Sequence, residues 1–468
     1  MANASTLASW YPDATAKAKS LQGASVFERN LEAALDLHRA EGGYFKIQKG
    51  ISEPGSIDCS SLDVLSLTSS GTMRQAYLDE LSQHPNFKLN DGSSRLMSDS
   101  WYTDEAEREI AKFHGAETAL ILKSGWDANG AILTAIPRPG DAIVYDELIH
   151  ASVHEGMNLS LAATKLAFKH NDADSFREVL LTIRESEQLI REGKRCVLVS
   201  VESVYSMDGD VVPLREMVQI GKEIFGEGIV QFIIDEAHST GVIGKGGRGL
   251  VNDLGLEKEI AVRMHTYGKA LATSGGAAVL CSATVREMLV NYGRVIIYSN
   301  APQFSTVAAI RAAYTLMKSG QLEPLQDNLQ DAIKYFYKAI TSHPVYDEAC
   351  DAGILSIPNA ENWETAQQLT HISYVITRQR YTLFLYFHLQ LAKFIVLPIH
   401  YPVVPKGKSR VRIVFHARHT KEQLDDLANS ICAWAQEMMD IEVGGKKTNK
   451  IPTATRQVYA ARQHVTAA

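Results

Sequence analysis

Short apolar runs alternate with amphipathic stretches through the middle of the chain. Five runs hold a few consecutive apolar residues each, namely TALILKSG, DAIVYDEL, CVLVSVES, VQFIIDEA and AAVLCSA. Between them, DADSFREVLLTIRESEQLI and PLREMVQIGKEIFGEG space their apolar residues as amphipathic helices do. Continuous apolar strands that alternate with helices predict an α/β fold, in which helices cover both faces of a mostly parallel sheet.

The pattern changes towards both ends of the chain. Near the start, one predicted helix has apolar positions at Leu31, Leu35 and Leu37 and is followed by loops rich in serine and glycine. Near the end, the helix LQDNLQDAIKYFYKAI opens a stretch of mixed strands and helices, and the last residues are polar and basic, as in a solvated extension. We therefore expect an N-terminal arm, a large domain, a smaller α+β domain and a polar tail, over residues 1–90, 91–320, 321–443 and 444–468.

Composition narrows the classes of protein that fit. The 468 residues are 45% hydrophobic and 22% charged, as in an ordinary globular enzyme. The formal net charge of −7 gives no electrostatic footprint for a nucleic-acid partner. The five cysteines are scattered without a CxxC pair, so neither a disulfide framework nor a zinc cage is indicated. No apolar run approaches the ~18 residues of a membrane span and no signal-peptide core is evident, so we expect a cytoplasmic protein without a membrane span.

The chain contains no complete motif for a helicase, a dinucleotide-binding loop or a zinc site of the HExxH type. The stretch QFIIDEAHSTG spells a helicase box, but a helicase also needs a GxxxxGK[ST] loop for its nucleotide. The one candidate for that loop, at Gly407, has Pro402 where the first glycine is required. GKGGRG literally satisfies GxGxxG, yet it does not directly follow a predicted strand, as a dinucleotide-binding loop must. No HExxH is present, so we expect no metal site.

Asp235 closes the apolar run QFIID, where a strand is expected to end inside the protein. An ionised carboxylate that leaves water costs several kcal/mol unless a positive group accompanies it. Lys269 stands in MHTYGKALATSGGAAVL among small residues, which leave room for a ring beside the lysine. A lysine that reaches a cofactor carbonyl and an aspartate that meets a protonated pyridine nitrogen together predict pyridoxal 5'-phosphate (PLP) as the partner of Asp235.

Other polar residues follow predicted strands in order along the chain. His238 is predicted to bond the phenolic oxygen of the cofactor, and His150, in DELIHASVHEG, to stack on the pyridine ring. The turn SGWDANGA joins a strand to a helix start, where backbone N–H groups bind phosphate. Arg412 alternates with Arg410 on a predicted strand in SRVRIVF, a pattern that also fits two solvated side chains.

Several ordered motifs together resemble one family. DEAHSTGVIGKGGRG, VESVYSMDGD, IHASVHEG, GWDANGA and HTYGKALATSGGAAVLCS look like the α-oxoamine synthases, and the resemblance covers residues from about 90 to about 435. That family includes 8-amino-7-oxononanoate synthase, 2-amino-3-ketobutyrate CoA ligase, 5-aminolevulinate synthase and serine palmitoyltransferase. The resemblance implies a PLP enzyme of fold type I, which is the aspartate-aminotransferase fold, and a homodimer with shared active sites.

The resemblance also implies a role for each matching residue. Lys269 would be the Schiff-base lysine, Asp235 the partner of the pyridinium, and Arg412 the ligand of the amino-acid carboxylate. The remaining residues would surround the cofactor: His150 on the ring, Glu202 beside the site, His238 and Ser206 at the phenolic oxygen or the substrate carboxylate, Gly125, Trp126 and Thr266 at the phosphate, and Ser299 and Asn300 reaching the phosphate from the partner subunit.

The implied reaction is a decarboxylative Claisen-type condensation. A small α-amino acid loses its Cα proton to Lys269, the carbanion attacks an acyl thioester of coenzyme A or a carrier protein, and CO2 leaves to give an α-amino ketone. Two alternatives stay open, an aminotransferase on the same fold and a catalytically silent subunit. LSLTSSGT stands where family members usually carry Asn-Tyr-Leu-Gly, DGSSRLMSDSW replaces a glycine-rich loop, and Trp126 replaces Phe or Tyr. These departures leave the amino acid and the acyl chain open.

Overall fold

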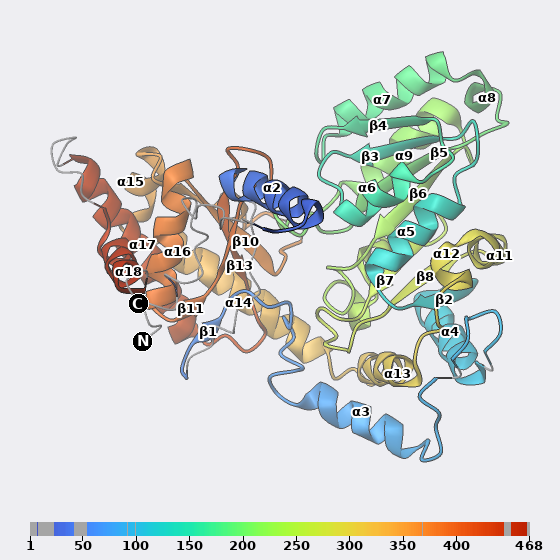
Figure 1. Cartoon of the computed structure of the whole chain (residues 1–468), viewed down its shortest axis with the longest axis horizontal. Coiled ribbons are helices and arrows are strands. Elements are labelled where there is room, and N and C mark those ends of the chain that lie inside the picture. The colour runs from blue at the N-terminus through green and yellow to red at the C-terminus, as the bar shows by residue number, and fades with distance from the viewer. Residues whose placement is uncertain are drawn as a thin grey trace. The chain divides into compact units, whose positions relative to one another are not determined.

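The chain folds into two compact units, each described by itself below (Figure 1). The structure is a computed structural model and describes Leu7 and residues 23–41, 54–90, 92–98, 100–366, 368–443 and 451–465. The large unit is Leu62–Leu329, and the small unit combines Met1–Ser61 with Gln330–Ala468. The domain boundaries expected from the sequence, at residues 91, 321 and 444, stay predictions.

A seven-stranded sheet forms the centre of the large unit, with the strand order β2-β8-β7-β6-β5-β3-β4. All neighbours pair in parallel except β8, which runs antiparallel to both β2 and β7. The strands are β2 (Thr118–Leu122), β3 (Ala142–Asp146), β4 (Thr164–Phe168), β5 (Val197–Glu202), β6 (Val230–Asp235), β7 (Ile260–Thr266) and β8 (Ala277–Cys281). The predicted α/β fold with a mostly parallel sheet is confirmed.

Helices cover both faces of this sheet, and neighbouring residues of β6 show why. Ile233 belongs to a core cluster that includes residues of α5 (Gly125–Ala135) and α6 (Ala151–Asn158). Phe232 points to the opposite face, where its ring lies 6.3 Å from that of Phe176 in α7 (Ala173–Ser186). Because successive strand residues face opposite sides, a sheet covered twice needs apolar residues at every position. That requirement explains the unbroken apolar runs.

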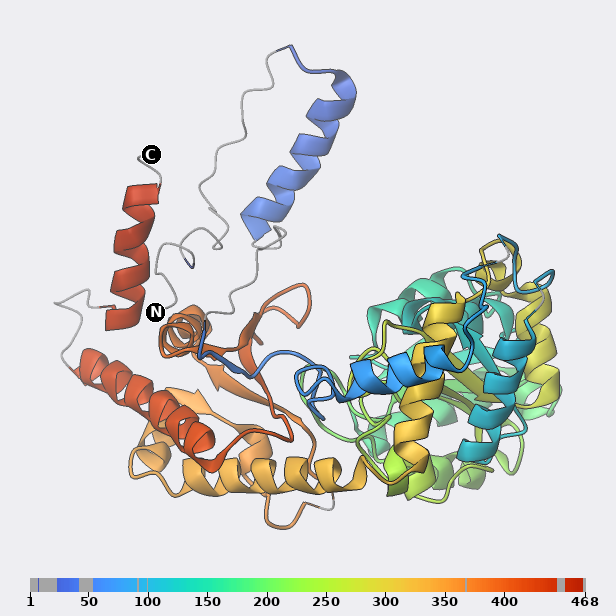
Figure 2. The same ribbon diagram turned by 90° about the horizontal axis from the view of Figure 1, so that it is seen from below.

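The large unit contains further helices, some of which pack against one another. Figure 2 shows α3 and α4, in blue and cyan, packed against α13, in yellow. The helices not yet given bounds are α3 (Thr72–Ser82), α4 (Trp101–His114), α8 (Gln188–Arg191), α9 (Leu214–Phe225), η1 (Lys245–Gly247), α10 (Leu250–Asp253), α11 (Ala283–Tyr292), α12 (Arg294–Ile297) and α13 (Phe304–Lys318).

The small unit is built on a four-stranded antiparallel sheet with the order β12-β13-β10-β9, and on a parallel pair formed by β1 and β11. The chain returns to this unit at Gln330, within α14. Its elements are α2 (Val26–Glu41), β1 (Ile57–Asp58), α14 (Glu323–Thr341), α15 (Tyr346–Asp351), β9 (Leu355–Ser356), η2 (Pro358–Ala360), β10 (Ile372–Thr377), η3 (Gln379–Tyr381), α16 (Thr382–Leu391), β11 (Phe394–Ile395), β12 (Leu397–Ile399), β13 (Arg410–Val414), α17 (Lys421–Val443) and α18 (Thr453–Val465).

The expectation of a solvated tail is wrong for α18. This helix packs against α16, and its residues Ala454, Thr455 and Val458 are buried. The stretch is polar overall, but three small or apolar side chains at helical spacing suffice to bury one side of a short helix. Over the described ranges, no helix combines the length and the apolar character that crossing a bilayer requires.

Candidate active site

Asp235 ends β6 and is buried, with 8% of its surface exposed. Its Oδ1 accepts a hydrogen bond from the backbone N–H of Ala237 at 2.9 Å, and its Oδ2 accepts one from the side-chain amide of Asn129 at 2.9 Å. Bonds to an ionised acceptor are stronger than neutral ones and hold the carboxylate in a fixed orientation. The aspartate is therefore aimed before any ligand binds.

A chain of hydrogen bonds continues from Asp235 to His150. The amide of Asn129 also donates to Ser152 Oγ at 3.0 Å, and Ser152 Oγ lies 2.8 Å from His150 Nδ1. The Nδ1 atom accepts the backbone N–H of Ser152, because His150 is the N-cap of α6. An accepting Nδ1 places the proton of a neutral ring on Nε2. One asparagine thus fixes both the carboxylate and the ring.

The buried environment of His150 favours its neutral form. Burial lowers the pKa of His150, the charge of Lys269 lowers it further, and the charge of Asp235 opposes the shift. A neutral ring is suited to stacking on a cationic pyridine, which an imidazolium would repel. The indole of Trp126 meets the His150 ring edge-on, with centroids 5.9 Å apart and planes at 79°.

Glu202 lies beside Asp235, because the ends of β5 and β6 pair in register. Burial raises the pKa of Glu202 well above its usual range, and the charge of Asp235 adds to the shift. Lys269 and the backbone N–H of His150 act in the opposite direction. Glu202 therefore favours the neutral carboxylic acid. The electrostatic contacts bring together four predicted site residues, namely His150, Glu202, Asp235 and Lys269.

The N-terminus of α5 provides donors at another side of this group. Ser124 is the N-cap of α5 and accepts the backbone N–H of Asp127, so the first turn starts with Gly125 and Trp126. A Cβ on Gly125 would lie 2.6 Å from Thr266 Cγ2, at the end of β7. Only glycine lets the helix start approach the Thr266 methyl group this closely, and the N–H groups of such a helix start suit a phosphate. These residues fit the predicted cofactor.

His238 and Ser206 lie on the loops that follow β6 and β5. His238 is buried in the turn after Asp235, where the N–H groups of Ser239 and Thr240 bond to the carbonyl of Glu236. Ser206 lies in the tight turn of a hairpin whose arms meet at Val204 and Val211. Both loops leave the carboxyl ends of adjacent strands, which is where ligands bind in open α/β sheets.

Ser299 and Asn300 line a pocket together with Arg95, Lys123 and Asp127. Lys123 Nζ donates to Ser299 Oγ at 3.3 Å, and Asn300 pairs with Ser94 in the DGSSR stretch. The predicted role of Ser299 and Asn300 at the phosphate of the partner's site stays a prediction.

Arg412 and Arg410 lie on β13 of the small unit, and both are buried, with 8% and 5% of their surfaces exposed. The alternative of two solvated arginines is wrong. The guanidinium of Arg410 lies 4.7 Å from the ring centroid of Tyr374, on the neighbouring strand β10. Burial lowers the pKa of both arginines, to about 10 for Arg410. A strand covered on both sides buries even its charged residues, which alternation alone did not reveal.

The second carboxylate of the DEAH stretch has a structural role. Glu236 is fully buried and accepts the backbone N–H of Val251 at 3.0 Å, while its Oε2 lies 3.2 Å from His265 Nε2. Burial raises its pKa to about 7 against the opposing effects of the Val251 N–H and Arg263. A Cβ on Gly249 would lie 2.6 Å from Glu236 Oε1. The glycine-rich loop GKGGRG thus packs closely against the carboxylate of Glu236. This packing explains the glycines without a bound nucleotide.

Sequence reasoning missed Asn129 and Ser152, although both stand inside motifs that were singled out. Asn129 lies one helical turn after Gly125, and Ser152 two residues after His150. Each is a polar side chain on an otherwise apolar helix face, which indicates a buried hydrogen bond. The partner of that bond can be identified only when the element facing the helix is known.

Comparisons with known proteins agree with this geometry. The family described as "Aminotransferase class I and II" matches residues 67–431. The aminoacyl transferase sphA of Aspergillus fumigatus is 51% identical over 97% of this chain and 97% of its own length. The 8-amino-7-oxononanoate synthase of Emericella nidulans is 41% identical over 86% of this chain and 95% of its own. A serine palmitoyltransferase from S. paucimobilis, solved with a bound PLP–myriocin aldimine, superposes with a TM-score of 0.67 at 22% identity, over 81% of this chain and 87% of that one.

Replacing Asn129 tests the hydrogen-bonded chain. Asn129→Ala removes the donors to Asp235 and Ser152, and a bond to a charged group contributes about 1.5–3 kcal/mol. We expect the affinity of the apo-protein for PLP to fall about tenfold, as followed by quenching of intrinsic fluorescence. The control is Asn291→Ala, which removes an exposed amide bonded to the carbonyl of Glu287. Equal affinities of the two variants would contradict the proposed role of Asn129.

Proposed function

Because the chain belongs to the α-oxoamine synthase family within aminotransferase class I and II, we propose that it condenses a small α-amino acid with an acyl thioester. It is a PLP-dependent transferase of fold type I. In the proposed reaction, a C–C bond forms between the amino-acid Cα and the thioester carbonyl, and the C–S bond breaks to release a thiol. The Cα–carboxylate bond then breaks to release CO2, which leaves an α-amino ketone.

One observation carries the proposal for the site. The charges of Lys269 and Asp235 both act on His150 and on Glu202, so a lysine and an oriented carboxylate lie near the same two residues. PLP, when bound there, would supply a cationic ring that delocalises the electrons of a deprotonated Cα. The carboxylate of Asp235 would keep the ring nitrogen protonated.

The residues of the chain have distinct tasks in this proposal. Lys269 Nζ removes the Cα proton and returns a proton to the product, a role supported by its charge acting with that of Asp235 on Glu202. The helix start at Gly125 and the hydroxyl of Thr266 would hold the phosphate of the cofactor. Neutral His150 would lie against the ring face. Arg412 binds the amino-acid carboxylate through two parallel N–H bonds.

The two alternatives differ in their products. An aminotransferase would convert the amino acid into an oxo acid and release neither CO2 nor thiol, whereas a silent subunit would consume no thioester. The presence of Lys269 argues against a silent subunit, because that lysine is a reactant. The names of the two relatives above, an aminoacyl transferase and an oxononanoate synthase, support acyl transfer. Location in the cytoplasm remains a prediction.

The decisive experiment presents glycine, L-alanine and L-serine with acyl-CoA thioesters of several lengths, and measures thiol and CO2 release together. We expect one amino acid to give equal amounts of both products. Lys269→Ala should lower this turnover about a thousandfold or more, because the proton-transferring group is lost. Lys245→Ala, at an exposed lysine of the large unit, is the control and should retain full activity. Turnover by Lys269→Ala at a tenth of the wild-type rate would contradict the assignment.

A second experiment tests the carboxylate ligand. Lysine keeps the charge of arginine but lacks its planar fork, so Arg412→Lys should raise the apparent KM for the amino acid about tenfold. Arg410→Lys should leave this KM unchanged, because Arg410 is engaged with Tyr374 and donates from Nε to the carbonyl of Lys408. A large effect at Arg410 alone would exchange the roles of the two arginines. No effect at either position would place the carboxylate elsewhere, with the Thr68–Ser70 turn as the next candidate.

We further propose a homodimer. Exposed apolar side chains gather on two segments that bond to each other through Ser94 and Asn300, and they include Leu96, Met97 and Tyr298. Exposed apolar clusters of this kind mark protein interfaces. Light scattering should give twice the mass of one chain, and Met97→Glu should shift the protein towards monomer. Leu189→Glu on α8, also at an exposed leucine, should not. A fully active monomer would refute the shared site.

A further inference from the structure

The hairpin that carries Ser206 is held to the sheet at its base. The backbone N–H of Ser203 donates to the carbonyl of Asp235 at 2.8 Å, and Val204 pairs with Val211. Beyond this bridge the chain makes a tight turn, closed by the N–H of Gly209 on the carbonyl of Tyr205 at 2.8 Å. Two more backbone bonds join the arms, from the N–H of Tyr205 to the carbonyl of Asp210 at 3.1 Å and from the N–H of Val212 to the carbonyl of Ser203 at 3.3 Å. These bonds shape the hairpin, and side-chain contacts with other elements fix where its tip lies.

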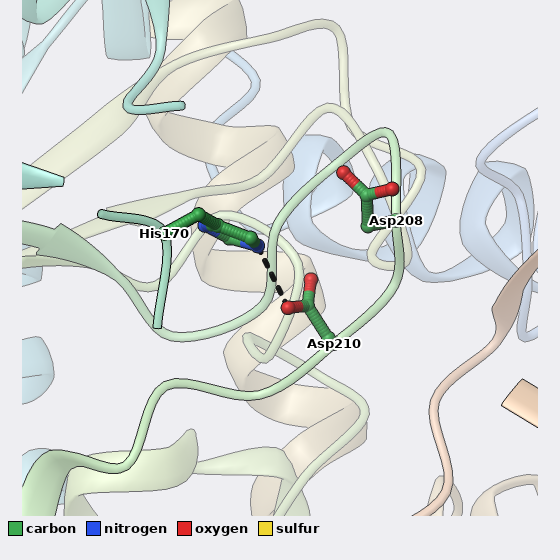
Figure 3. Close-up of side chains that lie close together, drawn as sticks. All are labelled: His170, Asp208 and Asp210. Carbon is green, nitrogen blue, oxygen red and sulfur yellow. Dashed lines mark hydrogen bonds and ion pairs between the residues drawn. The ribbon is translucent and has the colours of Figure 1, made fainter. Parts of the chain in front are cut away.

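Asp210 supplies such a contact at the end of the turn. Its Oδ2 accepts hydrogen bonds from His170 Nε2 at 2.7 Å and from the Asn171 amide at 2.6 Å. Figure 3 shows the ring of His170 facing the Asp210 carboxylate across the dashed bond, with Asp208 on the same loop. The ring of Tyr205 also meets the His170 ring edge-on, with centroids 4.5 Å apart. His170 therefore contacts the hairpin on both sides of Ser206, at Tyr205 and at Asp210.

The other ring nitrogen of His170 bonds to a different element. His170 Nδ1 lies 2.9 Å from Oδ1 of Asp146, which is fully buried at the end of β3. The same carboxylate accepts the N–H of Leu148 at 2.8 Å and the N–H of Asn171 at 2.9 Å. The Leu148 bond shapes the turn that leads to His150. The ring thus joins the His150 turn to the Ser206 hairpin.

Both carboxylates stabilise the charged form of this histidine. Burial opposes protonation, but the hydrogen bonds and charges of Asp146 and Asp210 outweigh it and raise the pKa of His170 to about 10. At neutral pH both ring nitrogens carry protons and both donate. A ring that donates at both nitrogens is fixed in position and in orientation.

We propose that His170 is a positioning residue of the active site, whose ring between Asp146 and Asp210 holds the Ser206 hairpin in place beside the turn that leads to His150. This inference rests on the proposed function, in which Ser206 contacts the phenolic oxygen of the cofactor or the substrate carboxylate. His170 touches neither and acts through the hairpin. It supplies the outer fixation that site residues on loops require.

A metal ion is the competing explanation for this cluster. Atoms of His170, Asp208 and Asp210 that can bind metals lie within 4.8 Å of one another. A metal-bound histidine must offer an unprotonated nitrogen. Here Nε2 and Nδ1 each point at a carboxylate oxygen within 2.9 Å, an arrangement that favours two N–H donors. Hydrogen bonds from a protonated His170 to Asp146 and Asp210 therefore explain this cluster better than a bound metal ion does.

A double-mutant cycle on PLP affinity tests the inference without turnover. Fluorescence titration of apo-protein is carried out with the wild type, His170→Gln, Ser206→Ala and the double variant. We expect each single variant to bind PLP about fivefold to tenfold more weakly, and the double variant no more weakly than the weaker single variant, because the two residues act as one unit. Additive losses, or wild-type affinity of His170→Gln, would overturn the proposal.

Two further variants keep the test decisive. Asp210→Asn retains an oxygen that accepts from Nε2 but loses the charge, and it replaces His170→Gln in the cycle if circular dichroism shows that His170→Gln does not fold. Arg177→Gln, which breaks an exposed pair with Glu223 at 2.9 Å, is the control and should bind PLP as the wild type does.

Loss of PLP binding on treatment with EDTA, with recovery on adding Ca2+ or Mg2+, would assign the cluster to a metal ion. A wild-type protein that binds PLP but consumes no thioester would refute the proposed function. The cycle of PLP affinities could still be measured and would still test the role of His170.

Discussion

The site is organised around one buried carboxylate, that of Asp235 at the end of β6. Placing a negative charge there is costly, and the protein offsets the cost partly with two N–H donors, from Ala237 and Asn129. These donors orient the group, but they bring no positive charge of their own. The site is consequently preorganised for a cationic ligand, and PLP with a protonated ring nitrogen meets this requirement.

Other carboxylates at the ends of neighbouring strands are stabilised by different means. For Glu202, next to Asp235, burial and the Asp235 charge both raise the pKa, which favours the neutral carboxylic acid. Glu236 faces the opposite side and bonds to the N–H of Val251 and lies against His265. Asp146 bonds to the charged ring of His170. Asp235 acts together with Lys269 on both His150 and Glu202, whereas Glu236 and Asp146 hold elements of the fold.

Much of this arrangement could be predicted from the sequence, and the limits have physical causes. Apolar runs predicted five of the seven strands, because a strand covered on both faces favours apolar residues at every position. The other two, β4 and β7, carry Lys165 and Arg263 and were not predicted. Polar residues directly after those runs, such as Asp235 and His150, were predicted because strand ends converge at one edge of such a sheet. Asn129 was not predicted, because its bond to Asp235 joins residues that are 106 positions apart. Pairings over such distances depend on the tertiary structure, which leaves no periodic trace in the sequence.

Local patterns also failed where burial departs from residue type. Arg410 looked solvated, but it lies inside the small unit against Tyr374, where a guanidinium can stack on an aromatic ring. The segment of α18 looked like a polar extension, although Ala454 and Val458 are buried. In both cases composition described the segment as a whole, whereas packing depends on which side chains face the neighbouring element.

Two histidines of the large unit show most clearly what residue type leaves undetermined. Both stand just after a strand, and an unperturbed histidine titrates near neutral pH. Burial and the charge of Lys269 lower the pKa of His150, whose Nδ1 accepts a hydrogen bond and whose ring is therefore neutral. Asp146 and Asp210 overcome burial and raise the pKa of His170 to about 10, so that its ring donates at both nitrogens. The group bonded to each ring nitrogen decides whether the histidine presents a flat neutral face to a ligand or a charge that fixes a loop.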